Sequence, residues 1–179
     1  ALQRVQGTHQ WTVSFEDILE ADVLLLVGTN VTETNPITGL KVKEAVKRRG
    51  AKLITIEALQ PAIGAISNIM NLSLHHFGVK PDAYAAAILG FLKAVLDEQA
   101  VDPEFRTKAT GFIQDITAQL KTISWSVLEG VTGVTASAYK EAMKSFAKGQ
   151  KVVILVGPGV LRTSGGFGMM VNLLDLLLL

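Results

Sequence analysis

The sequence has 179 residues, a formal net charge of +1, no cysteine and only 6% aromatic residues. This length suits one domain, the lack of cysteine excludes disulfides, iron–sulfur clusters and thiolate metal sites in these residues, and the near-neutral charge argues against nucleic acid as a partner. Hydrophobic residues make up 49% of the sequence and the mean hydropathy is +0.35, which is typical of strands buried on both faces.

The N-terminal part of the sequence predicts a short helix followed by a buried strand. Ser14 and Asp17 have the spacing of a capping box, in which two side chains satisfy backbone N–H groups at the start of a helix. The apolar run that follows predicts a strand over residues 22–27.

A second helix and a second strand follow. Pro36 is favoured in the first turn of a helix, and Gly50 is a typical residue at a helix end. The residues with helical spacing on the apolar side of this helix are Leu40, Val42, Ala45 and Val46. The run 52–56 predicts the next strand, and two strands joined by one helix are expected to be parallel.

The rest of the chain continues this alternation. The pattern predicts strands at 70–74 and 152–156, a long apolar helix from Pro81–Asp82 to Glu98, a short helix from Asp102, helical pieces within 125–148, and a closing helix after the glycine-rich segment 157–166. Strands that alternate with helices predict an α/β fold, with an open, mainly parallel sheet and helices on both faces.

Both ends of the sequence suggest a larger parent protein. The sequence starts without Met and stops inside the apolar segment 171–179, so we expect residues 1–179 to be a single α/β domain excised from a larger subunit. The apolar stretches 83–96 and 176–179 are shorter than the roughly 20 residues that a membrane span needs, so no direct membrane insertion is expected.

In an open parallel sheet, ligands bind beyond the carboxyl ends of the strands. The predicted strands end at four loops, 28–36, 57–68, 75–82 and 157–166. Phosphate-binding turns at such ends carry patterns such as G-x-G-x-x-G or G-x-x-x-x-G-K-[ST], and the sequence contains neither pattern after residue 27. These loops are therefore either parts of a nucleotide site or ordinary connections between strands and helices.

Several residues in these loops have suitable chemistry for a nucleotide. Gly28 would let the backbone approach a ligand closely, and Asn30, Thr32 and Thr34 add neutral hydrogen-bonding groups. Glu57, just past the second predicted strand, stands where an acidic residue would bind a ribose hydroxyl, and the alternative is a surface glutamate.

Simpler roles are expected for the remaining polar residues of these loops. His75 and His76 are neighbours that point to opposite sides of an extended chain, so a shared metal ion is not expected. A Ser164–His76–Asp82 triad lacks the G-x-S-x-G turn that would support it. Arg162 could meet a phosphate, although a solvated loop arginine is the simpler interpretation.

The ordered set of segments resembles the third domain of the molybdopterin-dependent oxidoreductases. The segments that carry the resemblance are 16–30, 32–36, 47–56, 80–82, 131–134 and 153–159, and the match covers about residue 14 to the end of the sequence. The family includes formate dehydrogenases, nitrate reductases and the large iron–sulfur subunit of bacterial NADH–quinone oxidoreductase, known as complex I.

The resemblance implies a Rossmann-like domain that holds one of two molybdopterin guanine dinucleotides in the catalytic members. Position by position, it implies that three loops face the cofactor together with the carboxylate of Glu57. The residues matched in these loops are Gly28, Thr29 and Asn30 in the first, Lys80, Pro81 and Asp82 in the second, and Gly157 and Gly159 in the last. In the second loop the family usually has the sequence Pro-Gly.

The sequence departs from the family after the second strand, where the family commonly reads Asp-Pro-Arg and this chain reads Glu57-Ala58-Leu59. Loss of the arginine removes a strong bidentate phosphate partner. This departure favours a complex I subunit domain that scaffolds electron transfer and has a degenerate dinucleotide site. The alternatives are the cofactor-binding domain of a formate dehydrogenase-type enzyme and an unrelated small nucleotide-binding domain.

These interpretations carry expectations about the parent protein. No cofactor is expected in the isolated fragment, whereas molybdopterin guanine dinucleotide and iron–sulfur clusters would be held in the parent. The expected partners are other domains of the same subunit and other subunits of a multi-subunit oxidoreductase. The expected location is cytoplasmic, peripheral to the inner membrane as part of a complex.

Overall fold

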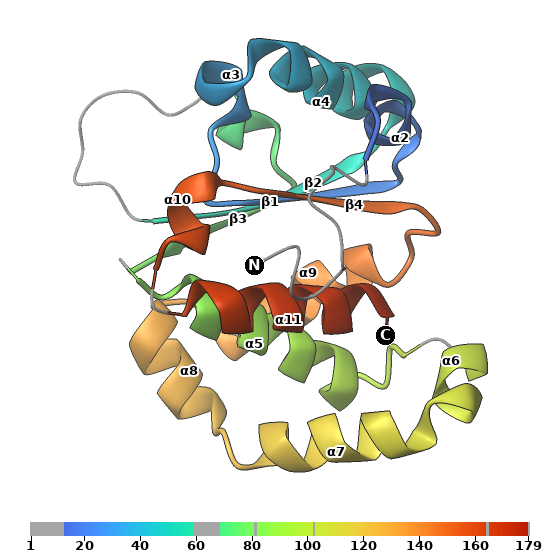
Figure 1. The fold of residues 1–179 in the computed structure, drawn as a ribbon, viewed down its shortest axis with the longest axis vertical. Helices are drawn as coiled ribbons and strands as arrows, with labels where there is room; N and C mark the ends of the chain where they lie inside the picture. Colours follow the sequence, from blue (N-terminus) through green and yellow to red (C-terminus); the bar gives the residue numbers. More distant parts are fainter. Residues whose placement is uncertain (1–12, 59–68, 81, 102, 164, 179) are drawn as a thin grey trace.

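Four parallel strands form one sheet in the computed structural model, which describes residues 13–58, 69–80, 82–101, 103–163 and 165–178. The strands are β1 (Val23–Val27), β2 (Lys52–Ala58), β3 (His75–Val79) and β4 (Val152–Val156), and they lie in the order β3-β2-β1-β4 (Figure 1). All three strand pairs are parallel, which confirms the predicted α/β sheet.

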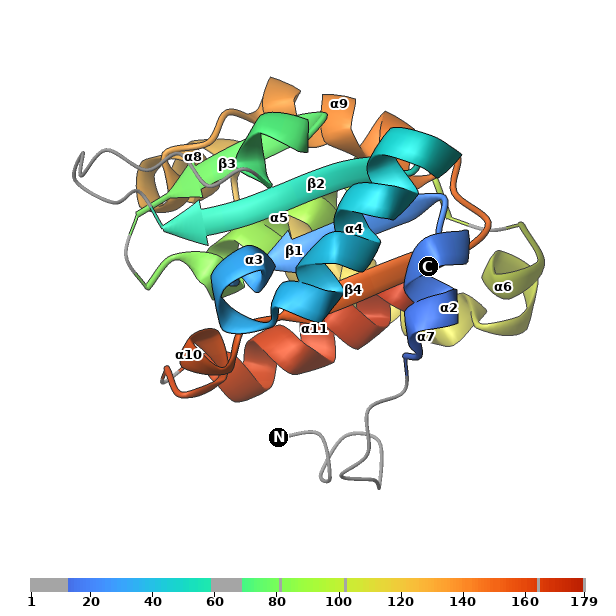
Figure 2. The same ribbon diagram turned by 90° about the horizontal axis from the view of Figure 1, so that it is seen from above.

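Helices cover both faces of the sheet, as predicted (Figures 1 and 2). The upper face in Figure 1 carries α2 (Phe15–Glu20), α3 (Val31–Thr34) and α4 (Pro36–Arg49). The core under these helices is formed mainly by apolar side chains from β1, β2 and α4, which are Leu24, Leu26, Val42, Ala45 and Leu53.

The lower face carries the larger helical layer. It contains α5 (Tyr84–Asp97), α9 (Ala136–Phe146) and α11 (Gly166–Leu178) against the sheet, with α6 (Pro103–Lys108), α7 (Thr110–Lys121) and α8 (Trp125–Thr132) further out. The indole Nε1 of Trp125 donates a 2.8 Å hydrogen bond to Asp97, and Lys93 Nζ donates a 3.3 Å bond to the Leu120 carbonyl. These two bonds attach α8 and α7 to α5.

The connections after β1 and β4 leave the sheet on opposite sides. The chain after β1 enters α3 and α4 on the upper face, whereas the chain after β4 passes through α10 (Pro158–Leu161) into α11 on the lower face (Figure 2). Adjacent strands whose connections diverge in this way define a switch point, where ligands of open α/β sheets commonly bind.

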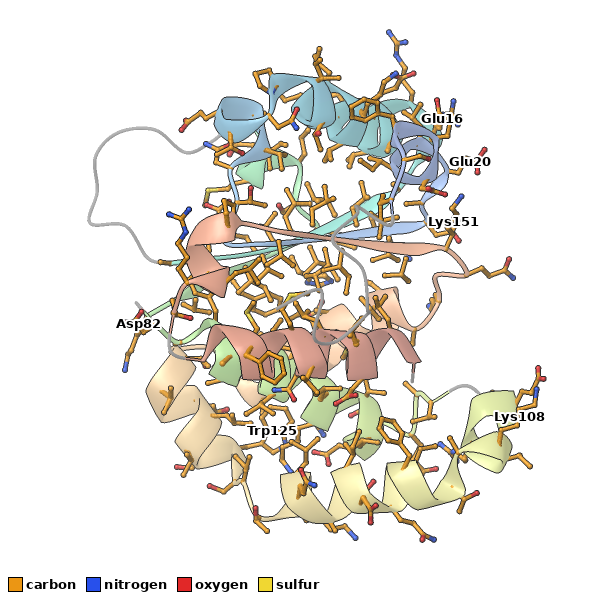
Figure 3. The ribbon with its side chains drawn as sticks, in the orientation of Figure 1. Glu16, Glu20, Asp82, Lys108, Trp125 and Lys151 are labelled. Carbon is orange, nitrogen blue, oxygen red and sulfur yellow. The ribbon has the colours of Figure 1, made fainter. Side chains whose placement is uncertain are left out.

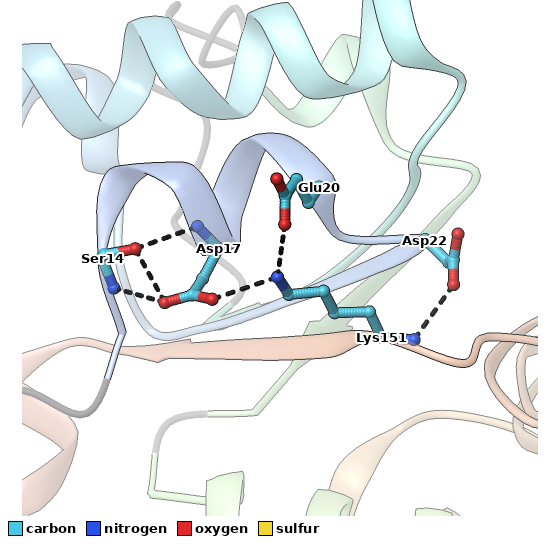
Figure 4. Close-up of polar contacts among 5 residues, drawn as sticks. All are labelled: Ser14, Asp17, Glu20, Asp22 and Lys151. Atoms are coloured by element: carbon cyan, nitrogen blue, oxygen red, sulfur yellow. Dashed lines mark hydrogen bonds and ion pairs between the residues drawn. The ribbon is translucent and has the colours of Figure 1, made fainter.

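Lys151 anchors α2 to the start of β4 (Figure 4). Its ammonium group lies 3.1 Å from Asp17 and 2.8 Å from Glu20. The predicted capping box is confirmed, because Ser14 Oγ accepts from Asp17 N and the Asp17 carboxylate accepts from Ser14 N. Asp22 adds a second link by accepting the backbone N–H groups of Gln150 and Lys151. These contacts therefore fix α2 beside the amino end of β4.

The predicted third strand is displaced along the sequence. Residues 70–74 were expected to form it, but Met70–Leu72 form a 3-10 helix, η1, and the strand begins at His75. The ring of Phe77 stacks 5.4 Å from that of Tyr139 and lies edge-on at 5.2 Å from Phe91. Burial of this aromatic residue sets the strand position, and the alternating apolar residues before it could not reveal that packing.

Three further predictions are corrected. The segment 75–82, expected to be a loop, contains β3. Glu57 lies inside β2 rather than just past it, because that strand continues to Ala58. Leu40 is 65% exposed, since the buried side of α4 is formed by residues around Val42. Helix α7 was not predicted, and Leu120 is its one buried residue, so its apolar pattern is weak.

Within the described ranges, no helix has both the length and the apolar character needed to cross a membrane.

Candidate functional site

The carboxyl ends of β1, β2 and β4 meet at one edge of the sheet. Gly28 N donates a 2.8 Å hydrogen bond to the Ile56 carbonyl, and Gly157 N donates a 2.8 Å bond to the Val27 carbonyl. The predicted residues Gly28, Thr29 and Gly157 and the neighbouring Glu57 therefore belong to one continuous surface.

Both glycines are required by contacts between the loops. Gly28 has a φ of +57°, and a β-carbon there would collide with Val160 and come within 3.2 Å of the Tyr84 ring. A β-carbon on Gly157 would collide with the Gly28 carbonyl oxygen. The first and last loops are thus packed against each other. The close backbone contact that requires glycine is therefore made between the two loops.

The polar residues after Gly28 mostly bond to one another. Asn30 Oδ1 accepts a 2.5 Å bond from Thr32, and the Asn30 carbonyl accepts N–H groups of the four-residue helix α3. At the start of α4, Asn35 Oδ1 accepts from the backbone N–H of Thr38 at 3.2 Å. A phosphate at the α4 N-terminus would have to compete with this cap.

Glu57 holds an unsatisfied carboxylate oxygen at this edge. It lies opposite Gly78 of β3, its side chain is half-buried, and its Oε1 atom is buried without a hydrogen-bond partner among the described residues. Burial raises the pKa of Glu57, and the negative charge of Glu33 raises this pKa further. A buried acceptor of this kind calls for a donor, and a ligand hydroxyl could supply it.

Tyr84 is a site residue that the sequence reasoning missed. Its hydroxyl oxygen accepts a 2.8 Å hydrogen bond from Ala58 N, and its ring lies against Gly28. Burial raises the pKa of Tyr84, and the Glu57 carboxylate adds to this, while the bond from Ala58 acts in the opposite direction. Its position in a long apolar helix gave no signal of this role.

The other predicted residues lie apart from Glu57 or have structural partners. Lys80 Nζ donates a 2.7 Å hydrogen bond to the Gly130 carbonyl of α8. Asp82 is exposed at the periphery of the molecule (Figure 3), and its φ of +61° delays the start of α5 to Tyr84. Pro81 lies outside the described residues. Gly159 is exposed, and a β-carbon there would meet no atom within 4 Å.

The two histidines of the sequence analysis lie at the start of β3. His76 Nδ1 is 2.8 Å from Thr55 Oγ1, and His75 Nε2 is 3.4 Å from Ser145 Oγ. Burial lowers the pKa of His76. In the part of the chain that the structure covers, no three His, Asp or Glu side chains gather as metal ligands.

A cavity of about 600 Å³ lies on the upper face at the switch point, between α2, the start of α4 and the end of β4. We call it the β4 crevice. Its lining includes Phe15, Glu16, Thr29, Asn35, Thr38 and Leu155. Such a volume is in the range of small-molecule sites. Of these residues, the sequence analysis had singled out only Thr29, because the others come together only when α2 packs beside β4.

The residues present fit the nucleoside part of a dinucleotide better than its phosphates. Glu57 has a free buried acceptor for a hydroxyl group, and the β4 crevice can hold a ring. By contrast, Lys80 is committed to α8, and none of the described residues that line the β4 crevice is Lys or Arg. Arg162, at the end of α10, is the exposed cation of the last loop.

This chain is similar in sequence and in fold to several known proteins. The chain is 25% identical over 168 residues to a nitrate reductase of Shewanella frigidimarina, covering 93% of this chain and 17% of that protein. It is 24% identical over 160 residues to the F420-dependent formate dehydrogenase subunit alpha of Methanocaldococcus jannaschii, covering 89% and 23%. The solved structure of acetylene hydratase from Pelobacter acetylenicus matches with a TM-score of 0.76 and 21% identity, covering 91% and 21%.

The chain therefore spans about a fifth of the length of these relatives. The family profile described as Molybdopterin oxidoreductase matches residues 2–178, which is almost all of the sequence. With that match and the parallel α/β sheet, this chain belongs to the molybdopterin oxidoreductase family.

Proposed function

We propose that this chain is the dinucleotide-binding domain of a molybdopterin-dependent oxidoreductase of the formate dehydrogenase or nitrate reductase kind. Its carboxyl-end edge would hold the nucleotide part of a molybdopterin guanine dinucleotide. The similarity to proteins named nitrate reductase and formate dehydrogenase supports the kind of enzyme. The site residues support the nucleotide.

The observation that carries this proposal is the unpaired buried oxygen of Glu57. Leaving a buried acceptor without a donor costs about 1–3 kcal/mol, and a ribose hydroxyl would satisfy it. An acidic residue at the carboxyl end of the second strand is also where Rossmann-type sites bind a ribose. Burial raises the pKa of Glu57 and so disfavours its charged carboxylate, which a hydroxyl donor would stabilise.

The chain's own residues would bind and orient the cofactor. Gly28 and Gly157 keep the first and last loops in fixed contact, and Tyr84 holds the end of β2 through Ala58. When bound in the parent enzyme, the molybdopterin group would supply the redox chemistry of its metal. Other domains and subunits would contribute the remaining cofactor contacts and iron–sulfur clusters, and we place the complex in the cytoplasm, peripheral to the inner membrane.

A complex I scaffold domain with a degenerate site is the second candidate. It is favoured by the residue after Glu57, which is Ala58 where the family commonly has proline followed by arginine. The hydrogen bond from Lys80 to α8 also favours the scaffold candidate, because it occupies an ammonium group that could otherwise bind a phosphate. If the chain is such a scaffold domain, the carboxyl-end edge of the sheet would contribute only to packing.

Calorimetric titration with GDP separates the two candidates. The dinucleotide-binding proposal expects measurable binding that Glu57→Gln weakens by about 10- to 150-fold, because one hydrogen bond to a charged group is lost. Glu141→Gln is the matched control, since this glutamate is exposed on α9 in the lower layer. A flat titration with folded protein, judged by circular dichroism, would favour the scaffold candidate.

A further inference from the structure

We propose that a groove at the amino end of the sheet binds a segment of a partner protein in which carboxylates flank one large apolar side chain. We call it the amino-end groove. It consists of three adjoining cavities around the C-terminal half of α9, with volumes of about 310, 330 and 610 Å³. The first residues of β1, β2 and β4 line it, so it lies at the opposite end of the sheet from Glu57. The proposal therefore does not depend on nucleotide binding.

The smallest cavity is lined by three cations. These are Arg49 at the end of α4, Lys52 at the start of β2 and Lys148 just after α9. None of the three side chains forms an ion pair or hydrogen bond with a described residue. Asp22 is the one acidic residue in the described lining, and it already accepts two backbone N–H groups of the loop before β4. Positive charge is thus concentrated here, although the net charge of the chain is only +1.

Stabilisation of helix ends accounts for only part of this charge. Cations in the last turn of a helix interact favourably with its free carbonyl groups, and Arg49 of α4 and Lys144 of α9 have this position. Lys52 begins a strand, where no helix end requires a cation. Lys144 and Lys148 both line the middle cavity, where their like charges repel each other. A carboxylate bound between these cations would remove that repulsion.

The largest cavity of the amino-end groove is apolar. No charged side chain occurs among the described residues that line it. Its apolar lining includes Val95, Met143, Phe146, Val152 and Leu176. Entry of a large apolar side chain would remove both its own surface and this lining from water, which is favourable. The groove therefore offers an apolar pocket next to a basic one.

The wall between the basic and the apolar cavity is fixed by the fold. Gly149 and Gln150 line both cavities. A β-carbon on Gly149 would lie only 2.7 Å from Val23 Cγ2, so this loop is packed directly against the start of β1. Asp22 accepts a 2.9 Å hydrogen bond from Gln150 N. Because the loop is already held in place, a ligand does not have to order it on binding.

An acidic polypeptide segment fits both parts of the groove. A phosphate would occupy only the basic cavity. Nucleic acid requires exposed aromatic side chains on which bases can stack, and Phe146, the one aromatic residue in the described lining of the three cavities, is only 7% exposed.

The acidic segment is assigned to a separate protein chain. Residues 1–12 and 59–68 contain no Asp or Glu, so these parts of the sequence cannot supply the carboxylates. Complementary charges at the rim of an interface increase the rate at which separate chains associate and help to select the correct partner. The unpaired cations of the amino-end groove suit this role.

Fluorescence anisotropy with a labelled peptide tests the proposal on the 179-residue chain. The probe has the sequence Glu-Glu-Phe-Glu-Glu. One control peptide has alanine in place of the phenylalanine, and another has glutamine in place of every glutamate. We expect the probe to bind at least tenfold more tightly than either control. Its affinity should fall as NaCl is added, because salt screens exposed charges.

Substitutions locate the binding in the amino-end groove. The combination of Lys52→Glu and Lys148→Glu should weaken binding of the probe at least tenfold, whereas Lys121→Glu, an exposed cation at the end of α7, is the matched control. Ala147→Trp should weaken binding by filling the apolar cavity, with Ala118→Trp on α7 as its control. Circular dichroism should show that each variant is folded. Lys148 and Ala147 are exposed, so their single substitutions keep the test decisive if the double variant does not fold.

Three results would overturn the proposal. The glutamine peptide could bind as tightly as the probe, Lys121→Glu could weaken binding as much as the groove substitutions, or a thymidine oligonucleotide could bind more tightly than the peptide, which would indicate nucleic acid. Dimerisation of the chain in sedimentation experiments, prevented by Lys148→Glu, would instead assign the groove to a second copy. The groove substitutions should leave GDP binding unchanged, so the failure of this proposal and that of the proposed function are distinguishable.

Discussion

Gly157 and Gly28 lie so close that a β-carbon on Gly157 would overlap the carbonyl oxygen of Gly28. The contact joins the ends of β4 and β1, which are hydrogen-bonded through Gly157 N and the Val27 carbonyl. Since the clash would be with backbone atoms, no side-chain rotation can relieve it. The two glycines therefore fix the geometry of the switch point before any ligand arrives.

Substitution of Gly157 should consequently destabilise the fold. We expect Gly157→Ala to lower the free energy of unfolding by about 1–3 kcal/mol, the usual range for overpacking. Gly159→Ala is the matched control, two residues away with open space around its β-carbon position, and should change stability by less than about 0.5 kcal/mol. Urea denaturation of the three proteins measures the difference, and equal losses at both positions would refute the contact.

Substitution of Asp82 by glycine should increase the stability of the fold, unlike substitution of Gly157. The φ of +61° at Asp82 is strained for a residue with a side chain, and the side chain is exposed. Asp82→Gly should raise the free energy of unfolding by up to about 1 kcal/mol, whereas the β-branched Asp82→Val should lower it. Thermal melting would show this order. If glycine were the least stable of the three, the side chain would have to make a stabilising interaction that outweighs the strain.

The sequence predicted those parts of the fold that depend on local chemistry. The all-apolar runs of β1 and β4, the capping box at Ser14 and the left-handed Gly50 that ends α4 were each recognisable from a few neighbouring residues. The position of β3 was not, because it depends on the packing of Phe77 against Tyr139, which lies more than sixty residues further along the sequence.

The candidate site shows the same division. Gly28, Glu57 and Gly157 were recognised at strand ends, where the topology gathers them. Tyr84 and the β4 crevice could not be predicted, because Tyr84 reaches Ala58 from another helix and the crevice exists only when α2 is held beside β4. The cofactor roles of the predicted residues remain predictions, and the titrations above test them.

The attachment of α2 should depend on pH. The hydrogen bonds from Ser14 and the ion pair with Lys151 lower the pKa of Asp17 from 3.8 to about 2. A lowered pKa in the folded state means that the contribution of Asp17 is present above pH 3.8 and is lost as the pH falls toward 2. Asp17→Asn should therefore flatten the acid side of the plot of melting temperature against pH. An unchanged slope between pH 4 and pH 2 would show that the carboxylate contributes nothing there.

The same anchor should respond to salt and to Lys151. Lys151→Met removes the partner of both Asp17 and Glu20 and should lower the melting temperature modestly, because the pairs are partly exposed. The difference between wild type and this variant should shrink in 1 M NaCl, where the Debye length is about 3 Å. Hydrogen exchange of the α2 amides would locate the effect, and faster exchange elsewhere but not in α2 would contradict it.

Glu57 should stabilise ligand binding and destabilise the free domain. Burial, with a smaller effect of Glu33, raises the pKa of Glu57 above 4.5, so its neutral form is favoured in the fold. That advantage is fully present below pH 4.5 and is lost as the pH rises through the folded pKa, where the half-buried carboxyl must ionise. Glutamine stays neutral, so Glu57→Gln should be more stable than wild type at pH 7 by about 1 kcal/mol, after allowance for the exposed half of the side chain. The difference should shrink below pH 4.5.

Urea denaturation at pH 4 and pH 7, combined with the GDP titration, measures both effects. A substitution that increases stability while weakening GDP binding is expected of a carboxylate retained for a ligand. If stability and binding decrease together, Glu57 has a structural partner and the nucleotide site must be sought elsewhere along this edge.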